Sequence, residues 1–431
     1  MAQQTSSTSF SVPQPWLGAV IAPEAAAASG TAEELIAAAL RHPIGTPPVR
    51  ELAQRMYRPG QRVAILIDDC TRKTPTAQIL PCVLAELAAA GVAQQDIAIV
   101  AALGTHRPLT EDELQTKLGA AAHGGYTIVN QPCTDGAGFV EVGQMSSLQG
   151  GVELPAIPAQ INRHVLEADL RISIGMITPH LDAGFSGGAK MVLPGVCSLA
   201  TVDAFHLASA FVPQNQLGDP HAPLRRLLEA FVARHAPLHF IVNVVLGLDG
   251  SLCACVAGDP IAAHRRGVEE ARRVYGVRLA RRYPVVIANC APYDQDLWQS
   301  IKGAWAGDLV TADGGTLILV TAAPEGNSSY GLVPYYAGID PDLLRAEILS
   351  GRVADAMQAA TGVLWGSLRR RTRLMLVSAG LTAADAASMR AEHFANVEAA
   401  MNAALARLPA AERAGAVAVI PQAGVVLPIP G

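Results

Sequence analysis

The first half of the chain alternates between short apolar runs and longer stretches with helical spacing. Apolar runs of strand length occupy Arg62–Asp69, Asp96–His106 and Asp169–His180. The segment TAQILPCVLAELAAAG, between the first two runs, carries apolar residues at helical intervals. Short continuous apolar runs are typical of strands buried inside a sheet. The pattern therefore predicts a βαβ unit over residues 62–106, followed by another buried strand that ends near His180.

The second half of the chain repeats this alternation. Between helices, strands are expected near Val285–Asn289, Thr316–Thr321, Leu374–Ser378 and Ala416–Ile420. Before them, His239–Asp259 resembles a hairpin that turns at Asp249 and Gly250. We therefore expect an α/β fold with two α/β domains, over residues 12–265 and 275–425, and with the functional site in the cleft between them.

Each of the three strands predicted in the first half ends in residues that could carry chemistry. Asp69 and Arg72 follow the first strand, His106 follows the second and His180 follows the third. In an open α/β sheet, ligands bind outside the carboxyl ends of the strands, where loops and helix N-termini gather. We therefore expect these side chains to surround one ligand.

The composition narrows the class of protein. Half of the 431 residues are hydrophobic, but the longest uncharged apolar runs, such as FIVNVVLGL, have about nine residues, against the roughly 20 that a membrane-spanning helix needs. The N-terminus has no basic region followed by an apolar one, so we expect no secretion signal. The net charge is −5 without a long basic run, which argues against nucleic acid as a partner. We expect a soluble cytoplasmic protein.

One glycine-rich loop contains a lysine, in a chain that has only four lysines among 32 basic residues. The loop is PHLDAGFSGGAKMVLPG, Pro179–Gly195, and the lysine is Lys190. It is not a phosphate-binding P-loop, because Met191 follows the lysine where serine or threonine is required. A lysine amine, unlike arginine, can form covalent bonds when it is deprotonated. We therefore expect Lys190 to attach a substrate or cofactor. The alternative is a tight turn with an incidental lysine, since Lys117 is interpreted as an ordinary surface lysine.

Three histidines are candidates for further chemistry. His106 and His180 would form a proton donor and acceptor pair if they faced one ligand from opposite sides; the alternative is that each is an ordinary loop residue. His206 lies in the apolar helical stretch Leu199–Phe211. It is either a hydrogen-bonded core histidine or a ligand for nickel, copper, zinc or iron.

Other polar residues could hold an anionic ligand. Arg72 could grip a carboxylate with two hydrogen bonds, or pair with Asp69, or lie on the surface beside an aspartate that caps a helix. Gln299 and Lys302, three residues apart, share one helical face that either holds ligand oxygens or is simply exposed. The tyrosine-containing stretch Glu325–Gly338 is either a pocket loop or an ordinary one.

Taken together, these segments resemble the lactate racemase family, whose cofactor is a nickel-pincer nucleotide. The matching elements, in the order typical of the family, are DDCTR at 68–72, GTHRPLT at 104–110, the loop PHLDAGFSGGAKMVLPG, VDAFH at 202–206 and QSIKG at 299–303. They span both predicted domains. Several independent motifs therefore support the family, although they do not specify the substrate.

The resemblance implies how the cofactor is held. The cofactor is a pyridinium-3,5-bisthiocarboxylic acid mononucleotide carrying nickel, and Lys190 would be joined to it through a thioamide. The imidazole of His206 would complete the coordination of nickel. Asp69 would lie beside the cofactor. The backbone that lies against it would come from Ser186, Gly187 and Gly188.

The resemblance also implies the reaction, which is inversion at the hydroxyl-bearing carbon of a 2-hydroxy acid that is lactate-like or larger. The hydrogen of that carbon would leave as hydride and return to the other face of a keto acid, while His106 and His180 act as acid and base. The residues that position or surround the substrate would be Arg72, Gln299, Lys302 and Trp298. Cofactor-maturation enzymes would be partners. Two alternatives are a carrier that binds the pincer nucleotide without turnover and, less favoured, a Schiff-base enzyme that uses Lys190.

Overall fold

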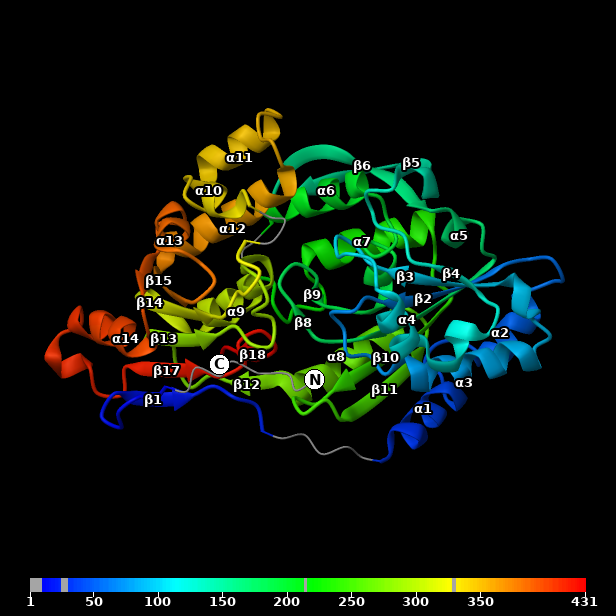
Figure 1. Ribbon diagram of the computed structural model, residues 1–431, viewed down its shortest axis with the longest axis horizontal. Helices are drawn as coiled ribbons and strands as arrows, with labels where there is room; N and C mark the ends of the chain where they lie inside the picture. The colour runs from blue at the N-terminus through cyan, green and yellow to red at the C-terminus, as the bar shows by residue number, and fades with distance from the viewer. Residues whose placement is uncertain (1–9, 25–29, 213–214, 328–330) are drawn as a thin grey trace.

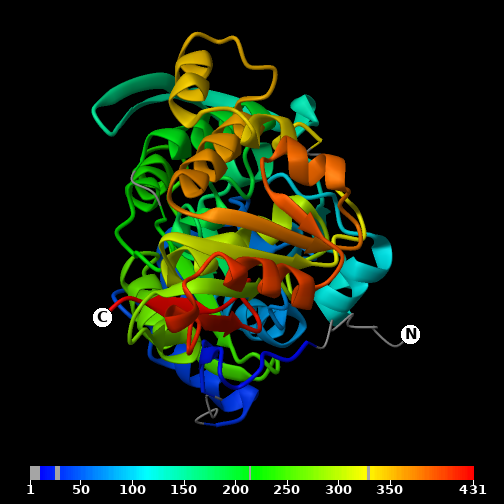
Figure 2. The ribbon, with the colours of Figure 1, turned by 90° about the vertical axis from the view of Figure 1, so that its left-hand side faces the viewer.

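The computed structural model describes residues 10–24, 30–212, 215–327 and 331–431. Each half of the chain contains a six-stranded sheet, and Figure 1 shows the two sheets side by side with helices around them. In Figure 2, turned by 90°, the strands of the second half lie next to one another across the side that faces the viewer, with the first half behind them. The predicted α/β fold is confirmed.

The first sheet consists, in spatial order, of β11 (Leu252–Gly258), β10 (Phe240–Leu246), β7 (Leu170–Met176), β2 (Val63–Asp68), β3 (Ile97–Ala102) and β4 (Thr127–Val129). All of its pairs are parallel except the β10–β11 hairpin, which was predicted from the sequence. The three strands predicted to end in functional residues, β7, β2 and β3, are direct neighbours. Their carboxyl ends therefore meet at one edge of the sheet.

Both faces of the first sheet are covered, which explains its continuous apolar strands. Ile65 and Ile67 of β2 pack in one core with the helices α1 (Ala32–Arg41), α2 (Val49–Met56) and α3 (Thr76–Ala89). Ala64 and Leu66 of the same strand face the opposite core, which includes α7 (Pro223–His235). The remaining helices of this half are α4 (Glu111–Leu118), α5 (Arg163–Leu166), α6 (Leu199–Leu207) and α8 (Ala262–Tyr275).

The second sheet consists, in spatial order, of β1 (Leu17–Val20), β17 (Val417–Ile420), β13 (Tyr283–Asn289), β14 (Thr311–Thr321), β15 (Arg373–Ser378) and β16 (Glu392–Phe394), all parallel. The four strands predicted for this half are therefore present. Its helices are α9 (Leu297–Val310), α10 (Val333–Ala337), α11 (Pro341–Leu349), α12 (Ala356–Arg371), α13 (Ala383–Ser388) and α14 (Val397–Ala406).

The short strand β1 belongs to the second sheet, although the predicted domain division places its residues in the first domain. Residues Leu17–Val20 fall inside the predicted first domain, 12–265, but β1 pairs with β17 in the second sheet (Figure 1). The physical reason is that β17 would otherwise be an edge strand with unpaired backbone groups. A four-residue strand carries no periodicity that could assign it to either sheet. The division at 12–265 and 275–425 otherwise stays a prediction.

The smaller elements complete the chain. Two-stranded pairs are formed by β5 (Phe139–Gln149) with β6 (Val152–Asn162), β8 (Pro179–His180) with β9 (Gly184–Phe185), and β12 (Gly276–Arg278) with β18 (Leu427–Ile429). Short 3₁₀ helices are η1 (Gln94–Asp96), η2 (Gly119–His123), η3 (Gly136–Gly138), η4 (Gly188–Met191), η5 (Ala208–Phe211) and η6 (Ala410–Glu412). Within the described ranges, no helix has both the length and the apolar character needed to cross a membrane.

Candidate functional site

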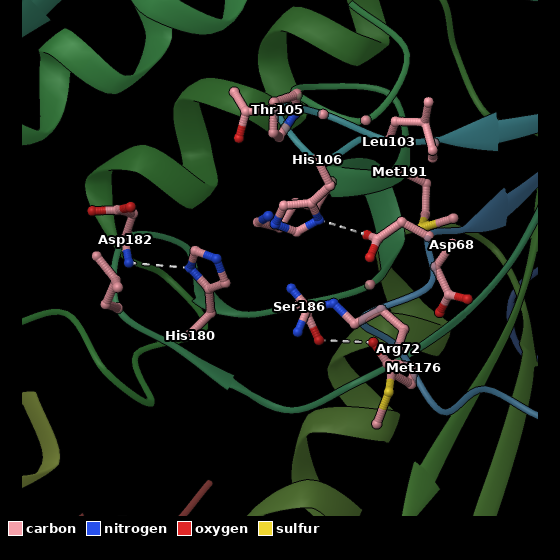
Figure 3. Close-up of a pocket in the computed structure, with 18 of the residues that line it drawn as sticks. Asp68, Arg72, Leu103, Thr105, His106, Met176, His180, Asp182, Ser186 and Met191 are labelled. Carbon is pink, nitrogen blue, oxygen red and sulfur yellow. Dashed lines mark hydrogen bonds and ion pairs between the residues drawn. The ribbon is translucent and has the colours of Figure 1, made fainter. Parts of the chain in front are cut away.

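A cavity lies at the carboxyl ends of β2, β3 and β7 (Figure 3). The predicted site residues that line it are Asp69, Arg72, His106, His180, Ser186, Gly187, Lys190, His206, Trp298 and Lys302. Trp298 and Lys302 come from α9, so both halves of the chain contribute to its wall. Two predicted site residues, Gln299 and Gly188, do not line this cavity.

His106 lies beside a carboxylate that orients its ring. Its Nδ1 is 3.1 Å from Oδ2 of Asp69. Burial alone would raise the pKa of the Asp69 carboxyl, but His106, Arg72 and Thr71 together hold this pKa well below its usual range. The contact between Nδ1 and Oδ2 lacks the geometry of a hydrogen bond, but an ionised carboxylate beside Nδ1 favours the tautomer of His106 with the proton on Nδ1 and the lone pair on Nε2. His106 can therefore accept a proton at Nε2.

His180 has the opposite arrangement. Its Nδ1 accepts the backbone N–H groups of Asp182 (3.2 Å) and Ala183 (3.4 Å), so the neutral ring carries its proton on Nε2. Burial, followed by the charges of Lys190 and Arg72, holds the pKa of His180 well below its usual value. Figure 3 shows the imidazoles of His106 and His180 pointing into the same cavity. The two neutral rings thus present one hydrogen-bond acceptor, at Nε2 of His106, and one hydrogen-bond donor, at Nε2 of His180.

His206 on α6 has the orientation of a metal-binding imidazole. Its Nδ1 lies 2.8 Å from the carbonyl oxygen of Val202, one turn earlier, and can only donate a proton there. The lone pair is therefore on Nε2. Burial lowers the pKa of His206 to about 4, so the ring is neutral at physiological pH. A backbone carbonyl that fixes the tautomer in this way is a common support for a histidine that binds metal through its other nitrogen.

His206 is not part of a complete protein-borne metal site. Across the described part of the chain, no group of three or more histidine, cysteine, aspartate or glutamate side chains is placed to hold a metal ion. A single imidazole binds a transition metal firmly only when other ligands accompany it. The donor set therefore suits a metal that arrives with its own ligands.

Lys190 projects from η4 into the cavity. Burial, then the charges of Arg72 and Arg225, lower the pKa of its amine to about 7, against the opposing effect of Asp182. An ordinary lysine is almost entirely protonated at pH 7, whereas the lowered pKa makes the unprotonated, nucleophilic form of the Lys190 amine accessible near neutral pH.

This gives a testable prediction for the protein before cofactor is attached. Reductive methylation of Lys190, followed by peptide mass mapping, is expected to rise between pH 6 and 8 and to level off above pH 8, because the free amine is the reactive form. The exposed Lys73 is the internal reference. Equal pH profiles for Lys190 and Lys73 would contradict a lowered pKa.

Three buried side chains that we did not predict shape the loop before Lys190. Arg225 of α7 is fully buried and donates to the carbonyls of Ala183, Phe185 and Gly187. Asn243 of β10 accepts the N–H of Gly188 (2.9 Å). The third is His264 of α8, whose Nε2 donates to the carbonyl of Ser186 (2.9 Å). These three side chains therefore form hydrogen bonds with backbone carbonyl and N–H groups of the loop.

The glycines of this loop are required by space and by conformation. Gly187 and Gly188 have φ of 75° and 58°. A Cβ on Gly187 would lie 2.7 Å from Oδ1 of Asn243, and one on Gly188 would lie 2.9 Å from the ring of His264. Gly188 therefore packs against the supporting residues, while Gly187 borders the cavity.

Lys117 is not the surface residue that we predicted. It is 9% exposed, and its Nζ lies 2.6 Å from Oδ1 of Asp68 and donates to the carbonyls of Asp69 (2.8 Å) and Arg72 (3.1 Å). The prediction was wrong because burial of a helix residue depends on what packs against the helix, here the turn after β2. Lys117 holds that turn, and with it Asp69 and Arg72, in place.

We expect Lys117→Met to lower the free energy of unfolding by about 3–5 kcal/mol, because it leaves the Asp68 carboxylate buried without its cation. Urea unfolding followed by circular dichroism measures the change. Lys73→Met, at an exposed lysine of the same turn, is the matched control and should change it by less than about 0.5 kcal/mol. Equal small effects of both substitutions would show that the buried pair does not stabilise the turn.

Basic side chains from both halves of the chain, Arg72 and Lys302, line the cavity and could bind an anionic group there. Tyr293 lies between them: its ring centroid is 4.1 Å from Nζ of Lys302 and 6.0 Å from the guanidinium carbon of Arg72. Burial, then Arg72 and Lys190, hold the pKa of Lys302 well below its usual value. Gln299 accepts a hydrogen bond from Lys302, so it orients this cation. Anionic ligand groups would relieve the mutual repulsion of these charges.

The tyrosine-containing stretch 325–338 does not contribute to this cavity through the tyrosines that can be placed. Tyr335 is exposed, and Tyr336 is buried and accepts the N–H of Ala354 (3.0 Å). Tyr330 lies outside the described residues. Tyr335 and Tyr336 both lie in α10 and not in a loop, and they are an ordinary exposed and an ordinary buried helix residue.

Comparisons with known proteins identify the family and related folds. A family model described as the lactate racemase N-terminal domain matches residues 4–218. The lactate racemase of Lactiplantibacillus plantarum is 34% identical over 312 residues, which are 72% of this chain and 70% of that protein. That of Thermoanaerobacterium thermosaccharolyticum is 30% identical over 323 residues, 74% of this chain and 72% of that protein. The structure of the lactate racemase apoprotein from T. thermosaccharolyticum superposes with a TM-score of 0.82 at 24% identity, over 97% of both chains.

Proposed function

Since the chain belongs to the lactate racemase family, and is therefore an isomerase, we propose that it inverts the hydroxyl-bearing carbon of a 2-hydroxy acid with a nickel-pincer nucleotide tethered to Lys190. The observation that carries this proposal is the convergence of a nucleophilic amine, a neutral imidazole with a free Nε2 and two further histidines on one cavity. A racemase turns over its substrate, so the alternative of a carrier without turnover falls away.

The residues present suit the cofactor. The Lys190 amine, with its pKa lowered to about 7, could condense with a thiocarboxylic acid group of the cofactor, with loss of water, to form the thioamide link. Nε2 of His206 can bind nickel, whose other ligands come from the cofactor itself. Gly187 borders the cavity, so a flat ring could lie against its backbone, and its φ of 75° is one that glycine adopts without strain. When bound, the cofactor supplies a group that accepts hydride from the substrate carbon and returns it.

Arg72 and Lys302 would hold the substrate carboxylate. A guanidinium binds a carboxylate through two parallel hydrogen bonds, whereas an ammonium acts as a point charge. Gln299 keeps the ammonium of Lys302 in place. A carboxylate fixed at one end still lets the rest of a flat keto acid turn, so either face can be presented.

His106 and His180 would handle the hydroxyl proton. For one enantiomer, Nε2 of His106 takes the proton, and the Asp69 carboxylate at 3.1 Å stabilises the resulting imidazolium. For the other enantiomer Nε2 of His180 would take the proton, which requires the tautomer with the proton on Nδ1 and release of the Nδ1 contacts to the backbone N–H groups of Asp182 and Ala183. The cations that depress its pKa in the free protein include Arg72 and Lys302, and a bound carboxylate offsets both. We therefore expect substrate binding to raise the pKa of His180 and enable it to hold a proton.

The test is chiral conversion by protein that has been matured with cofactor-synthesising enzymes. Single enantiomers of several 2-hydroxy acids are incubated with it and analysed by chiral chromatography. We expect at least one of them to approach a racemic mixture. Matured protein that carries the cofactor but converts none of them would refute the proposed function.

A further inference from the structure

A second, smaller cavity adjoins the first and is not used by the steps above. Both cavities are lined by Leu181, Asp182, His206 and Trp298, so they meet beside His206. The other residues that line the second cavity are Ser209, Ile301, Met357, Thr361 and Leu364. A ligand held near His206 would therefore have this second cavity next to it.

The second cavity is built by helices of both halves. Met357, Thr361 and Leu364 lie at spacings of four and three residues on α12 and so share one helical face. Ile301 of α9 comes from the same half, whereas His206 belongs to α6 of the first half. Met357, Ile301 and Leu364 are buried. The hydroxyl of Thr361 donates to the carbonyl of Met357 (3.2 Å), so its polar group is already satisfied by its own helix.

These walls favour an apolar occupant. None of the residues that line the second cavity is a lysine or an arginine, so a phosphate or a second carboxylate would enter it without a cation. Asp182, at the junction with the first cavity, would also repel such an anion when ionised, and burial raises its pKa to about 7. An anion that moves from water into a cavity without a cation loses its solvation, and no ion pair compensates for that loss. The cofactor phosphate and a dicarboxylate substrate are therefore poor occupants.

The size of the second cavity limits its occupant further. Its free volume is about 40 Å³, and one water-sized group needs about 10–15 Å³ of such volume. It therefore has room for three or four carbon-sized atoms, more than the methyl group of lactate and less than a phenyl ring.

We propose that this cavity receives the side chain of the substrate, and that the preferred substrates are 2-hydroxy monocarboxylic acids with an aliphatic side chain of three or four carbons. The inference rests on the proposed function, because it places the substrate at His206. Thr361, Met357 and Leu364 then determine specificity for chain length.

The first test is a substrate panel with matured protein: lactate, 2-hydroxybutyrate, 2-hydroxyisocaproate, phenyllactate and malate. One additional methylene in an apolar pocket changes kcat/KM by about 10-fold or more. We expect 2-hydroxyisocaproate to exceed lactate by at least about 10-fold, and malate to be the poorest. Higher kcat/KM for lactate, phenyllactate or malate than for 2-hydroxyisocaproate would overturn this inference while leaving the proposed function intact. Conversion of none of the five would overturn both.

The second test fills the cavity. Thr361→Leu should lower kcat/KM for 2-hydroxyisocaproate by about 10-fold or more and change that for lactate by less than about 3-fold. Thr116→Leu is the matched control, since Thr116 is an exposed helical threonine with the same bond to the carbonyl four residues earlier. Calorimetric titration of matured protein should show the same loss of affinity for 2-hydroxyisocaproate. Equal losses for both substrates, or no loss for either, would show that Thr361 does not face the substrate side chain.

Discussion

Lys190→Arg is expected to reduce racemisation to the background rate and to remove the mass of the cofactor from the protein. Arginine preserves the positive charge and much of the length of lysine, but its guanidinium stays protonated at all working pH values and cannot be acylated. The Lys190 amine, by contrast, is poised for acylation by its lowered pKa of about 7. The measurement is the intact mass of protein matured in the same cells, together with chiral conversion.

Folding and loading can be separated in this experiment. Within the described residues no ion pair involves Lys190, so its replacement breaks no such pair, and the thermal unfolding midpoint should change little. Lys73→Arg, at an exposed lysine, is the matched control and should retain both the added mass and the activity. If the Lys190→Arg protein still carries the added mass, the tether is elsewhere.

His106→Gln and His180→Gln are each expected to lower kcat/KM by about 10²–10⁴-fold, the usual contribution of a general acid or base. The loss should be the same for both enantiomers of the substrate. The two enantiomers have equal free energy, so the ratio of the forward and reverse kcat/KM values must equal one in any variant. Chiral chromatography of initial rates from each pure enantiomer gives both values.

A catalytic role predicts that these two variants still acquire the cofactor, because neither histidine is the tether or the metal ligand. Intact mass therefore distinguishes loss of catalysis from loss of loading. His221→Gln, at an exposed histidine, should behave like the unmodified protein. If one of the two variants keeps full activity, the histidine replaced in it does not act as acid or base. If one of them lacks the added mass, the histidine replaced in it binds the cofactor instead.

Much of the candidate site followed from short segments of sequence. Parallel strands have their carboxyl ends at one edge, so residues after β2, β3 and β7 had to come together once these strands were neighbours. Asp69, His106 and His180 do line one cavity for this reason. Even so, spacing alone did not reveal that Gln299 holds Lys302, because an i, i+3 pair on a helix can face a cavity or each other.

Other supporting residues could not have been identified in this way. Lys117 pairs with Asp68 across 49 residues, Arg225 reaches the carbonyl of Ala183 across 42, and His264 reaches that of Ser186 across 78. The sequence around each of these three residues shows no motif. Each residue has a role because it is buried beside a loop that is distant in sequence.

By itself, the sequence determined the alternation of strands and helices and the family, and it singled out the candidate reactive groups. Apolar spacing and side-chain chemistry are local properties, so they can be read without coordinates. Tertiary structure alone decided which histidine nitrogen carries a proton, which lysine is buried and where a second cavity opens between α6, α9 and α12. These depend on hydrogen-bond partners and packing contacts from distant segments, which the order of residues does not state.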